Sequence, residues 1–359
     1  MDDHIASPNP QAGAGPGAAH DHRHRHPRHN GHNFHNRRSY GALDLGTNNC
    51  RLLVARPADD GFTVIDAFSR IVRLGEGLST TGRLSDAAID RAVAALSICA
   101  DKLRRRHVSL SRSVATEACR RAANGRYFVR RVREETGIAL DIISPQEEAR
   151  LAVLGCHILL EPGDGPALIF DIGGGSTELV LIEPGAKGNR GGEPEILSWY
   201  SAPWGVVSLA EKEFNDLTTL EDRLDTYNRM RNRVAASFAD FASTLPTIGY
   251  QPRLLGTSGT VTTLASVHLE LPSYDRSKID GLVLPSEALR AVSTDLAHKS
   301  VSERAEVPCI GAERADLVVA GCAILEAILD IWPAERIGIA DRGIREGILR
   351  SMMAQEWQA

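Results

Sequence analysis

Residues 42–49, Ala-Leu-Asp-Leu-Gly-Thr-Asn-Asn, align without a gap with residues 169–176, Ile-Phe-Asp-Ile-Gly-Gly-Gly-Ser. In each copy an apolar run ends at an aspartate, and a turn of glycine and small polar residues follows. A second apolar run then begins near Leu52 in one copy and Leu179 in the other. This pattern predicts a duplicated strand–turn–strand. Since the two copies carry matched chemistry in register, we favour a functional repeat over two ordinary hairpins.

The turns of both copies have the composition of phosphate-binding loops. Glycine permits positive φ and close backbone approach, so that successive N–H groups can converge on an anion. Asn48 and Asn49 also suit left-handed turn positions for structural reasons alone. A third small-residue turn follows a predicted strand at residues 253–257. From these three turns we predict the following phosphate-binding residues: Thr47, Asn48, Asn49, Gly173, Gly174, Gly175, Ser176, Thr257 and Ser258.

The aspartate that precedes each duplicated turn predicts a metal ion. Asp44 and Asp171 would repel the phosphate that the turns attract. Mg²⁺ (or Mn²⁺) between carboxylate and phosphoryl oxygens removes this conflict. We predict Asp171 as the stronger metal ligand and Asp44 as the second.

The composition excludes several classes of protein. The chain has 359 residues, a formal charge of -5 and 43% hydrophobic residues, as an ordinary globular protein does. A general nucleic-acid binder would show a basic excess. No segment reaches the ~20 continuous apolar residues of a membrane span, and no secretory signal is recognisable. We therefore expect a cytoplasmic protein that binds neither nucleic acid nor membrane.

The length and the pattern of elements predict two α/β domains with a cleft between them. Residues 1–38 are rich in histidine and arginine and lack apolar periodicity, so we expect a disordered tail. Domain I spans residues 39–163, and we expect the terminal helix, residues 344–359, to pack on it. Domain II spans residues 164–343 and opens with the second copy of the repeat.

Several motifs resemble one family. The duplicated turns are similar to the phosphate loops of the actin-like ATPase superfamily. Five further stretches are similar to the exopolyphosphatase and guanosine-pentaphosphate phosphatase (Ppx/GppA) family, in its short two-domain form. The resemblance covers nearly everything from Tyr40 onward. These stretches are Arg70-Ile71-Val72-Arg73-Leu74-Gly75-Glu76-Gly77-Leu78, Ala115-Thr116-Glu117-Ala118, Ile143-Ser144-Pro145-Gln146-Glu147-Glu148-Ala149-Arg150-Leu151, Gly256-Thr257-Ser258-Gly259-Thr260 and Asp341-Arg342-Gly343-Ile344-Arg345-Glu346-Gly347.

The resemblance implies a fold, a reaction and roles for individual residues. The fold would be two actin-like (ribonuclease H-like) domains, and the reaction Mg²⁺-dependent removal of a terminal phosphate. Glu117 matches the family's proposed catalytic base, and Glu147 matches an acid of the catalytic cleft that also helps to hold the metal. Arg73 resembles a phosphate-contacting arginine. From spacing alone, Glu117 reads as a helix-start charge, Glu147 as part of a capping box with Ser144, and Arg73 as a solvated strand charge.

The predicted substrates are inorganic polyphosphate, guanosine pentaphosphate, or both, and we expect a homodimer. Two other classes of function stay open at this stage. One is a kinase or ATPase of the same superfamily, although the third turn lacks the Gly-Gly of the adenosine loop in those branches. The other is a phosphate sensor without catalysis, which the presence of several acids beside the turns disfavours.

Overall fold

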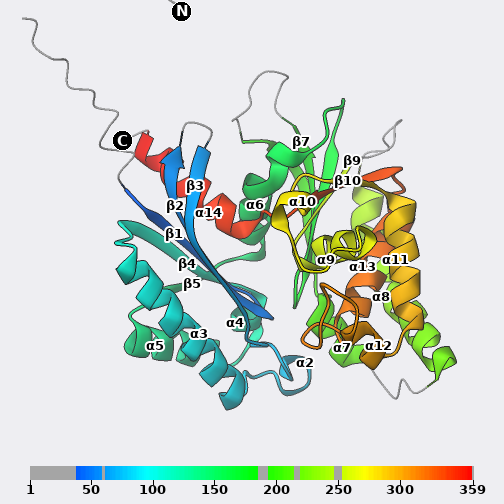
Figure 1. Cartoon of the computed structure of the whole chain (residues 1–359), viewed down its shortest axis with the longest axis horizontal. Coiled ribbons are helices and arrows are strands. Elements are labelled where there is room, and N and C mark those ends of the chain that lie inside the picture. Colours follow the sequence, from blue (N-terminus) through cyan, green and yellow to red (C-terminus); the bar gives the residue numbers. More distant parts are fainter. Residues whose placement is uncertain (1–37, 59–60, 185–192, 214–218, 246–252, 358–359) are drawn as a thin grey trace, which may run out of the picture.

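The computed structural model describes most of the chain and contains two β-sheets that lie side by side (Figure 1). The predicted disordered tail lies outside the described residues, apart from Arg38. Among the residues described, no helix is both long and apolar enough to cross a membrane. The description covers residues 38–58, 61–184, 193–213, 219–245 and 253–357.

The first sheet has five strands in the order β3-β2-β1-β4-β5. The first three strands are antiparallel, and β4 and β5 add to β1 in parallel. Helices α3 and α5 cover one face, where apolar side chains of α3 such as Ile89, Leu96 and Cys99 are buried (Figure 1). The elements are β1 (Tyr40–Leu45), β2 (Asn49–Ala58), β3 (Gly61–Ile71), α2 (Leu78–Thr81), α3 (Asp86–Arg105), β4 (Leu110–Ala115), α4 (Glu117–Arg121), α5 (Gly125–Thr136), β5 (Leu140–Ile142) and α6 (Pro145–Cys156).

The second sheet has six strands in the order β10-β11-β9-β6-β7-β8. Helices α8, α9, α11 and α13 form its larger apolar core, which includes Phe170, Phe238 and Ile324. The elements are η1 (His157–Leu159), β6 (Ala167–Ile172), β7 (Thr177–Glu183), β8 (Glu195–Ala202), α7 (Val206–Glu213), α8 (Leu220–Thr244), β9 (Arg253–Thr257), α9 (Gly259–His268), α10 (Arg276–Ile279), β10 (Val283–Pro285), α11 (Ser286–His298), α12 (Val301–Ala305), α13 (Val318–Ile331), β11 (Arg336–Ala340) and α14 (Ile344–Trp357).

The sequence repeat is a structural repeat. Hairpin β1–β2 closes with Leu45 opposite Cys50, and hairpin β6–β7 closes with Ile172 opposite Thr177, which are equivalent positions of the two copies. The first strand of each hairpin also pairs in parallel with a third strand: β1 pairs with β4, and β6 pairs with β9. The predicted duplication of the strand–turn–strand is therefore confirmed.

The two sheets are joined through α6 and α14. Buried side chains of α14, including Ile348 and Met352, pack on the first sheet. The helices touch where they lack side chains: a Cβ built at Gly155 would lie 2.0 Å from the carbonyl oxygen of Gly343, and one at Gly347 would lie 2.0 Å from that of Leu151. The chain crosses between the sheets at this place, after α6 and again before α14.

Candidate active site

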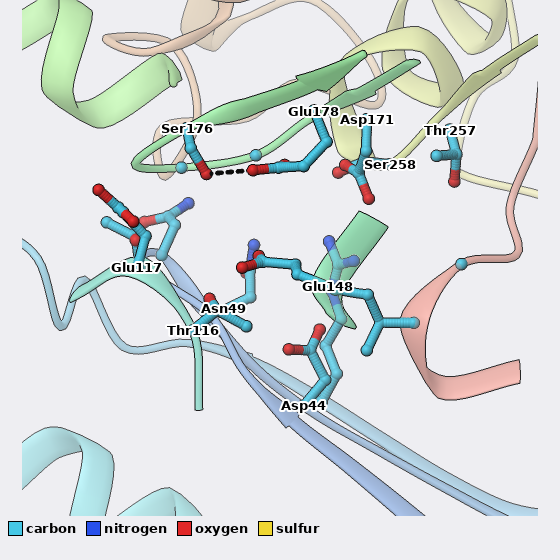
Figure 2. A pocket seen from close by; sticks show the side chains of 18 of the residues that line it. Asp44, Asn49, Thr116, Glu117, Glu148, Asp171, Ser176, Glu178, Thr257 and Ser258 are labelled. Atoms are coloured by element: carbon cyan, nitrogen blue, oxygen red, sulfur yellow. Dashed lines mark hydrogen bonds between the residues drawn. The ribbon is translucent and has the colours of Figure 1, made fainter. Parts of the chain in front are cut away.

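A pocket lies between the two sheets, at the ends of the strands that carry the repeat (Figure 2). Both duplicated turns, the start of α4, the third turn and the segment before α14 contribute to its wall. Of the predicted phosphate-binding residues, all those in the three turns line this pocket. The lining residues are Asp44, Gly46, Thr47, Asn48, Asn49, Arg51, Thr116, Glu117, Glu148, Asp171, Gly173, Gly174, Gly175, Ser176, Glu178, Thr257, Ser258, Asp341, Arg342, Gly343, Ile344 and Arg345.

The two duplicated turns are in contact across the pocket. A Cβ built at Gly174 would lie 3.0 Å from the Cβ of Thr47 and 3.1 Å from the backbone nitrogen of Asn48. One built at Gly175 would lie 2.6 Å from Oγ1 of Thr47 and 2.9 Å from Cγ of Glu117. Because a side chain at either glycine would push the turns apart, glycine is required here for close approach.

Buried carboxylates dominate the electrostatics of the pocket. Burial raises the pKa of Asp171 to about 6 and that of Asp44 above its usual value, while Arg51 opposes both shifts. Burial also raises the pKa of Glu178 to about 7, and the neighbouring Asp171 adds to this rise. Oε1 of Glu178 accepts hydrogen bonds from Oγ of Ser176 at 2.7 Å and from Oγ of Ser201 at 2.9 Å.

The pocket holds more acids than bases. Its lining includes six acids against three arginines, so that it is net negative when all of these groups are ionised. Arg51 is half-buried beside Asp44 and Asp171, and its desolvation lowers its pKa. The acids are Asp44, Glu117, Glu148, Asp171, Glu178 and Asp341, and the arginines are Arg51, Arg342 and Arg345.

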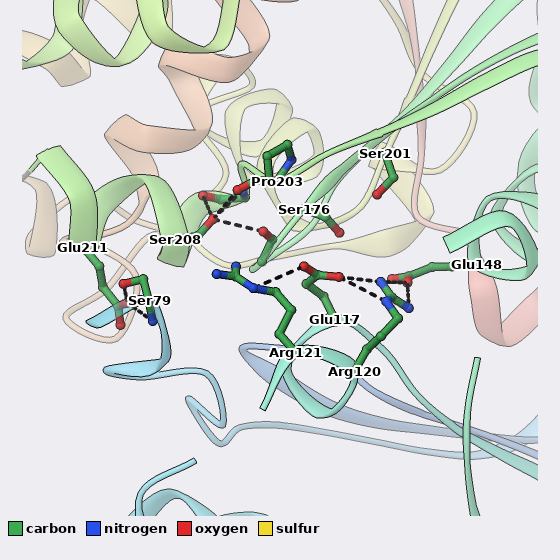
Figure 3. Close-up of polar contacts among 12 residues, drawn as sticks. Ser79, Glu117, Arg120, Arg121, Glu148, Ser176, Ser201, Pro203, Ser208 and Glu211 are labelled. Atoms are coloured by element: carbon green, nitrogen blue, oxygen red, sulfur yellow. Dashed lines mark hydrogen bonds and ion pairs between the residues drawn. The ribbon is translucent and has the colours of Figure 1, made fainter. Parts of the chain in front are cut away.

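An arginine connects two of the acids (Figure 3). Nη2 of Arg120 donates to Oε2 of Glu117 at 2.6 Å and to Oε2 of Glu148 at 3.1 Å. Nε of Arg121 lies 3.7 Å from the other oxygen of Glu117. Burial raises the pKa of Glu148 well above its usual value, Glu178 adds to the rise and Arg120 opposes it. Glu117 therefore stands beside the second turn with its carboxylate oriented by two arginines.

Several polar atoms of the first hairpin have no partner within the described part of the chain. Oδ1 of Asp44, Oγ1 of Thr47 and Oδ1 of Asn48 are buried and accept or donate no hydrogen bond there. No group of three or more His, Cys, Asp or Glu side chains among the described residues is close enough to hold a metal without further ligands. Mg²⁺ usually takes one or two carboxylates together with water and substrate phosphates, so Asp44 and Asp171 fit this kind of site.

The structure corrects two of the predicted positions. Glu147 does not reach the pocket: Oε1 accepts from Nη1 of Arg112 at 2.8 Å and Oε2 from Nε of Arg150 at 2.8 Å. Its neighbour Glu148 occupies the pocket instead. Arg73 also lies outside the pocket, because its guanidinium pairs with Asp316 at 2.8 Å.

Neither Arg51 nor Glu178 is among the site residues predicted from the sequence. The sequence repeat could have identified both, because they are charged residues at equivalent positions of the second strand of each hairpin, opposite Asp44 and Asp171. Helical spacing could have identified Glu148, because it precedes the buried Leu151 and Ala152 by three and four residues and so shares their face of α6.

Comparison with known proteins finds similar sequences and similar solved structures. A putative exopolyphosphatase of Haemophilus influenzae is 29% identical over 327 residues, which are 91% of this chain and 94% of the relative. Exopolyphosphatase 2 of Mycobacterium tuberculosis is 30% identical over 325 residues, 87% of this chain and 97% of the relative. The crystal structure of the Aquifex aeolicus member of the Ppx/GppA family has a TM-score of 0.70 and 28% identity, covering 89% of this chain and 98% of that one.

These similarities confirm the predicted fold of two actin-like α/β domains. They span both sheets and both copies of the repeat. The model of the Ppx/GppA phosphatase family matches residues 53–356, which are most of the chain, and the chain therefore belongs to that family.

Proposed function

We propose that this protein releases terminal orthophosphate from inorganic polyphosphate, from guanosine pentaphosphate, or from both. The family is one of exopolyphosphatase-type phosphohydrolases, and both curated relatives described above are called exopolyphosphatases. The observation that carries the proposal is the contact between the two glycine-rich turns, beside which buried polar atoms stand without partners.

The turns would bind the phosphates through their backbone. The fold packs the turn of residues 46–49 against that of residues 173–176, and residues of both turns line one pocket. Ser258 lies in the third turn with a φ of 81°, and the helix α9 starts directly after it. A helix N-terminus favours a bound anion.

The acids of the pocket fit a divalent cation. Asp44 and Asp171 would hold it, because desolvation raises both pKa values, and Oδ1 of Asp44 is buried and lacks a partner among the described residues. When bound, Mg²⁺ supplies positive charge that stabilises the phosphoryl oxygens. Arg51 and Arg345 lie in the same lining and would orient phosphate by charge.

Glu117 is our choice for the base that takes the proton of the attacking water. It starts α4 at the end of β4, next to the second turn, and Arg120 fixes its orientation. Arg120 ties it to Glu148, which we assign the second acidic position that Glu147 was expected to fill. Hydrolytic phosphoryl transfer depends mainly on such positioning of water, substrate and charge.

Phosphate release from the two substrates, measured side by side, tests the proposal. We expect orthophosphate from at least one of them in the presence of Mg²⁺, and loss of release in Glu117→Gln. Transfer of labelled phosphate to ADP or a sugar would instead indicate a kinase. Binding without any turnover would indicate a sensor.

A further inference from the structure

The edge of the cleft opposite α6 and α14 is closed by a second set of contacts between the domains. Here α2 and the segment before it, from domain I, meet α7 from domain II (Figure 1). Oε1 of Glu211, on α7, accepts a hydrogen bond from the backbone nitrogen of Gly77 at 2.6 Å. Its other oxygen accepts from the hydroxyl group of Ser79 and, at 3.4 Å, from the backbone nitrogen of Ser79 (Figure 3).

An ion pair reinforces this closure. Nη1 of Arg73 lies 2.8 Å from Oδ2 of Asp316, and Nη2 lies 3.2 Å from Oδ1, so the pair is bidentate. Nη2 of Arg73 also donates to the carbonyl oxygen of Glu313 at 3.0 Å. Arg73 has a φ of 45°, a left-handed conformation that a residue other than glycine keeps only where its surroundings hold it.

The segment of domain I that makes these contacts is hydrogen-bonded to the first turn of the repeat. The backbone nitrogens of Val72 and Arg73 donate to the carbonyl oxygen of Asn48 at 2.8 and 3.0 Å. The backbone nitrogen of Gly75 donates to the carbonyl oxygen of Thr47 at 2.9 Å. A displacement of this segment must therefore displace the first turn.

The helix that carries Glu211 is bonded in the same way to the second turn. The backbone nitrogens of Val206 and Val207 donate to the carbonyl oxygens of Gly173 and Gly174 at 3.0 and 2.8 Å. Oγ of Ser208 donates to the carbonyl oxygen of Gly175 at 3.0 Å. Hydrogen bonds and two short stretches of backbone thus connect one phosphate turn, through the Glu211 contacts, to the other.

We propose that Glu211, with the Arg73–Asp316 pair, forms a clasp that holds the two phosphate turns at their binding separation, which makes Glu211 a positioning residue. This rests on the proposed function of the pocket. The covalent crossings lie at α6 and α14, so opening about them must break the contacts of Glu211 with Gly77 and Ser79. Without the clasp a larger share of the molecules is open. The apparent affinity for substrate then falls in proportion to the fraction of molecules that stay closed.

Steady-state kinetics with polyphosphate tests the clasp against a merely structural role. Glu211→Ala should raise KM about tenfold, since bound phosphates still draw the turns together, and should change kcat by less than about threefold. Lys212→Ala, at the next and exposed position of α7, is the matched control and should match wild type. Glu211→Gln keeps an acceptor oxygen and should restore part of the affinity. A lower melting temperature with unchanged KM would overturn the proposal.

Hydrogen exchange of the ligand-free protein tests the clasp without any substrate. Glu211→Ala should speed exchange of the amides of residues 72–79 and 46–49 about tenfold, the change expected for loss of hydrogen bonds to a charged acceptor. Ser79→Ala, a milder change at the same contact, should have a smaller effect, and adding it to Glu211→Ala should change little more. Unchanged exchange in both turn segments would refute the clasp. Failure to hydrolyse either substrate would refute only the proposed function.

Discussion

Replacing Glu178 with glutamine should stabilise the metal-free protein, and the size of the effect should depend on pH. Glutamine keeps the volume and an oxygen that accepts the hydrogen bonds of Ser176 and Ser201, but it removes a buried negative charge. The pKa of Glu178 is raised from 4.5 to about 7, chiefly by burial. At ~1.4 kcal/mol for each pKa unit, ionised Glu178 costs the folded state roughly 3 kcal/mol.

The sign follows from proton binding. Between pH 4.5 and about 7 the folded protein holds more protons at Glu178 than the unfolded chain does, so stability decreases as pH rises through this window. Above this pH window ionised Glu178 destabilises the folded state to the full extent, and below the window this destabilisation is absent. The stabilisation of the variant over wild type should therefore be about 2–3 kcal/mol larger at pH 8.5 than at pH 5.0.

Urea unfolding in the presence of a chelator at these two pH values measures the difference. The control is Glu147→Gln, a matched change at a residue that does not line the pocket. Hydrogen bonds from Arg150 and Arg112 lower the pKa of Glu147, so it stays ionised at both pH values and its removal should shift both curves equally. A Glu178→Gln effect that is the same at pH 5.0 and pH 8.5 would refute the argument.

Three further predictions concern the base, the metal and the domain junction. Glu117→Gln should lower the rate of phosphate release by about 10²–10⁴ with little change in binding, and half of wild-type activity would exclude it as the base. Asp171→Ala should raise the Mg²⁺ concentration needed for half-maximal rate, and an unchanged titration would place the metal elsewhere. Gly347→Ala should destabilise the fold by about 1–3 kcal/mol in urea unfolding, because its Cβ would meet the Leu151 carbonyl oxygen at 2.0 Å; wild-type stability would contradict that contact.

The repeat made much of the site predictable from sequence. An apolar run, an aspartate and a glycine-rich turn fix both the hairpin and the side on which its turn lies, and the gapless alignment predicts that the two hairpins share a register. All turn residues singled out on that basis line the pocket, as do Asp44, Asp171 and Glu117. These features are local in sequence, and local pattern is what sequence reasoning reads best.

The two errors have different causes. Glu147 and Glu148 are adjacent, and a helix turns them about 100° apart, so only one can face the cleft. Glu147 lies on the exposed side with Arg150, whereas Glu148 shares the buried side with Leu151. Arg73 failed for a different reason, because its partner Asp316 is 243 positions away and in the other domain.

The two hairpins are equal in backbone register but not in charge. At equivalent positions of the returning strands, Arg51 stands opposite Asp44 and Glu178 stands opposite Asp171. When all four groups are ionised, three carboxylates and one guanidinium leave two negative charges, which is the charge that one divalent cation balances. Two arginine-bearing hairpins would leave no charge for a cation, and two glutamate-bearing hairpins would leave four carboxylates uncompensated. The difference between the copies at this position thus supports the proposal of a single divalent cation in the pocket.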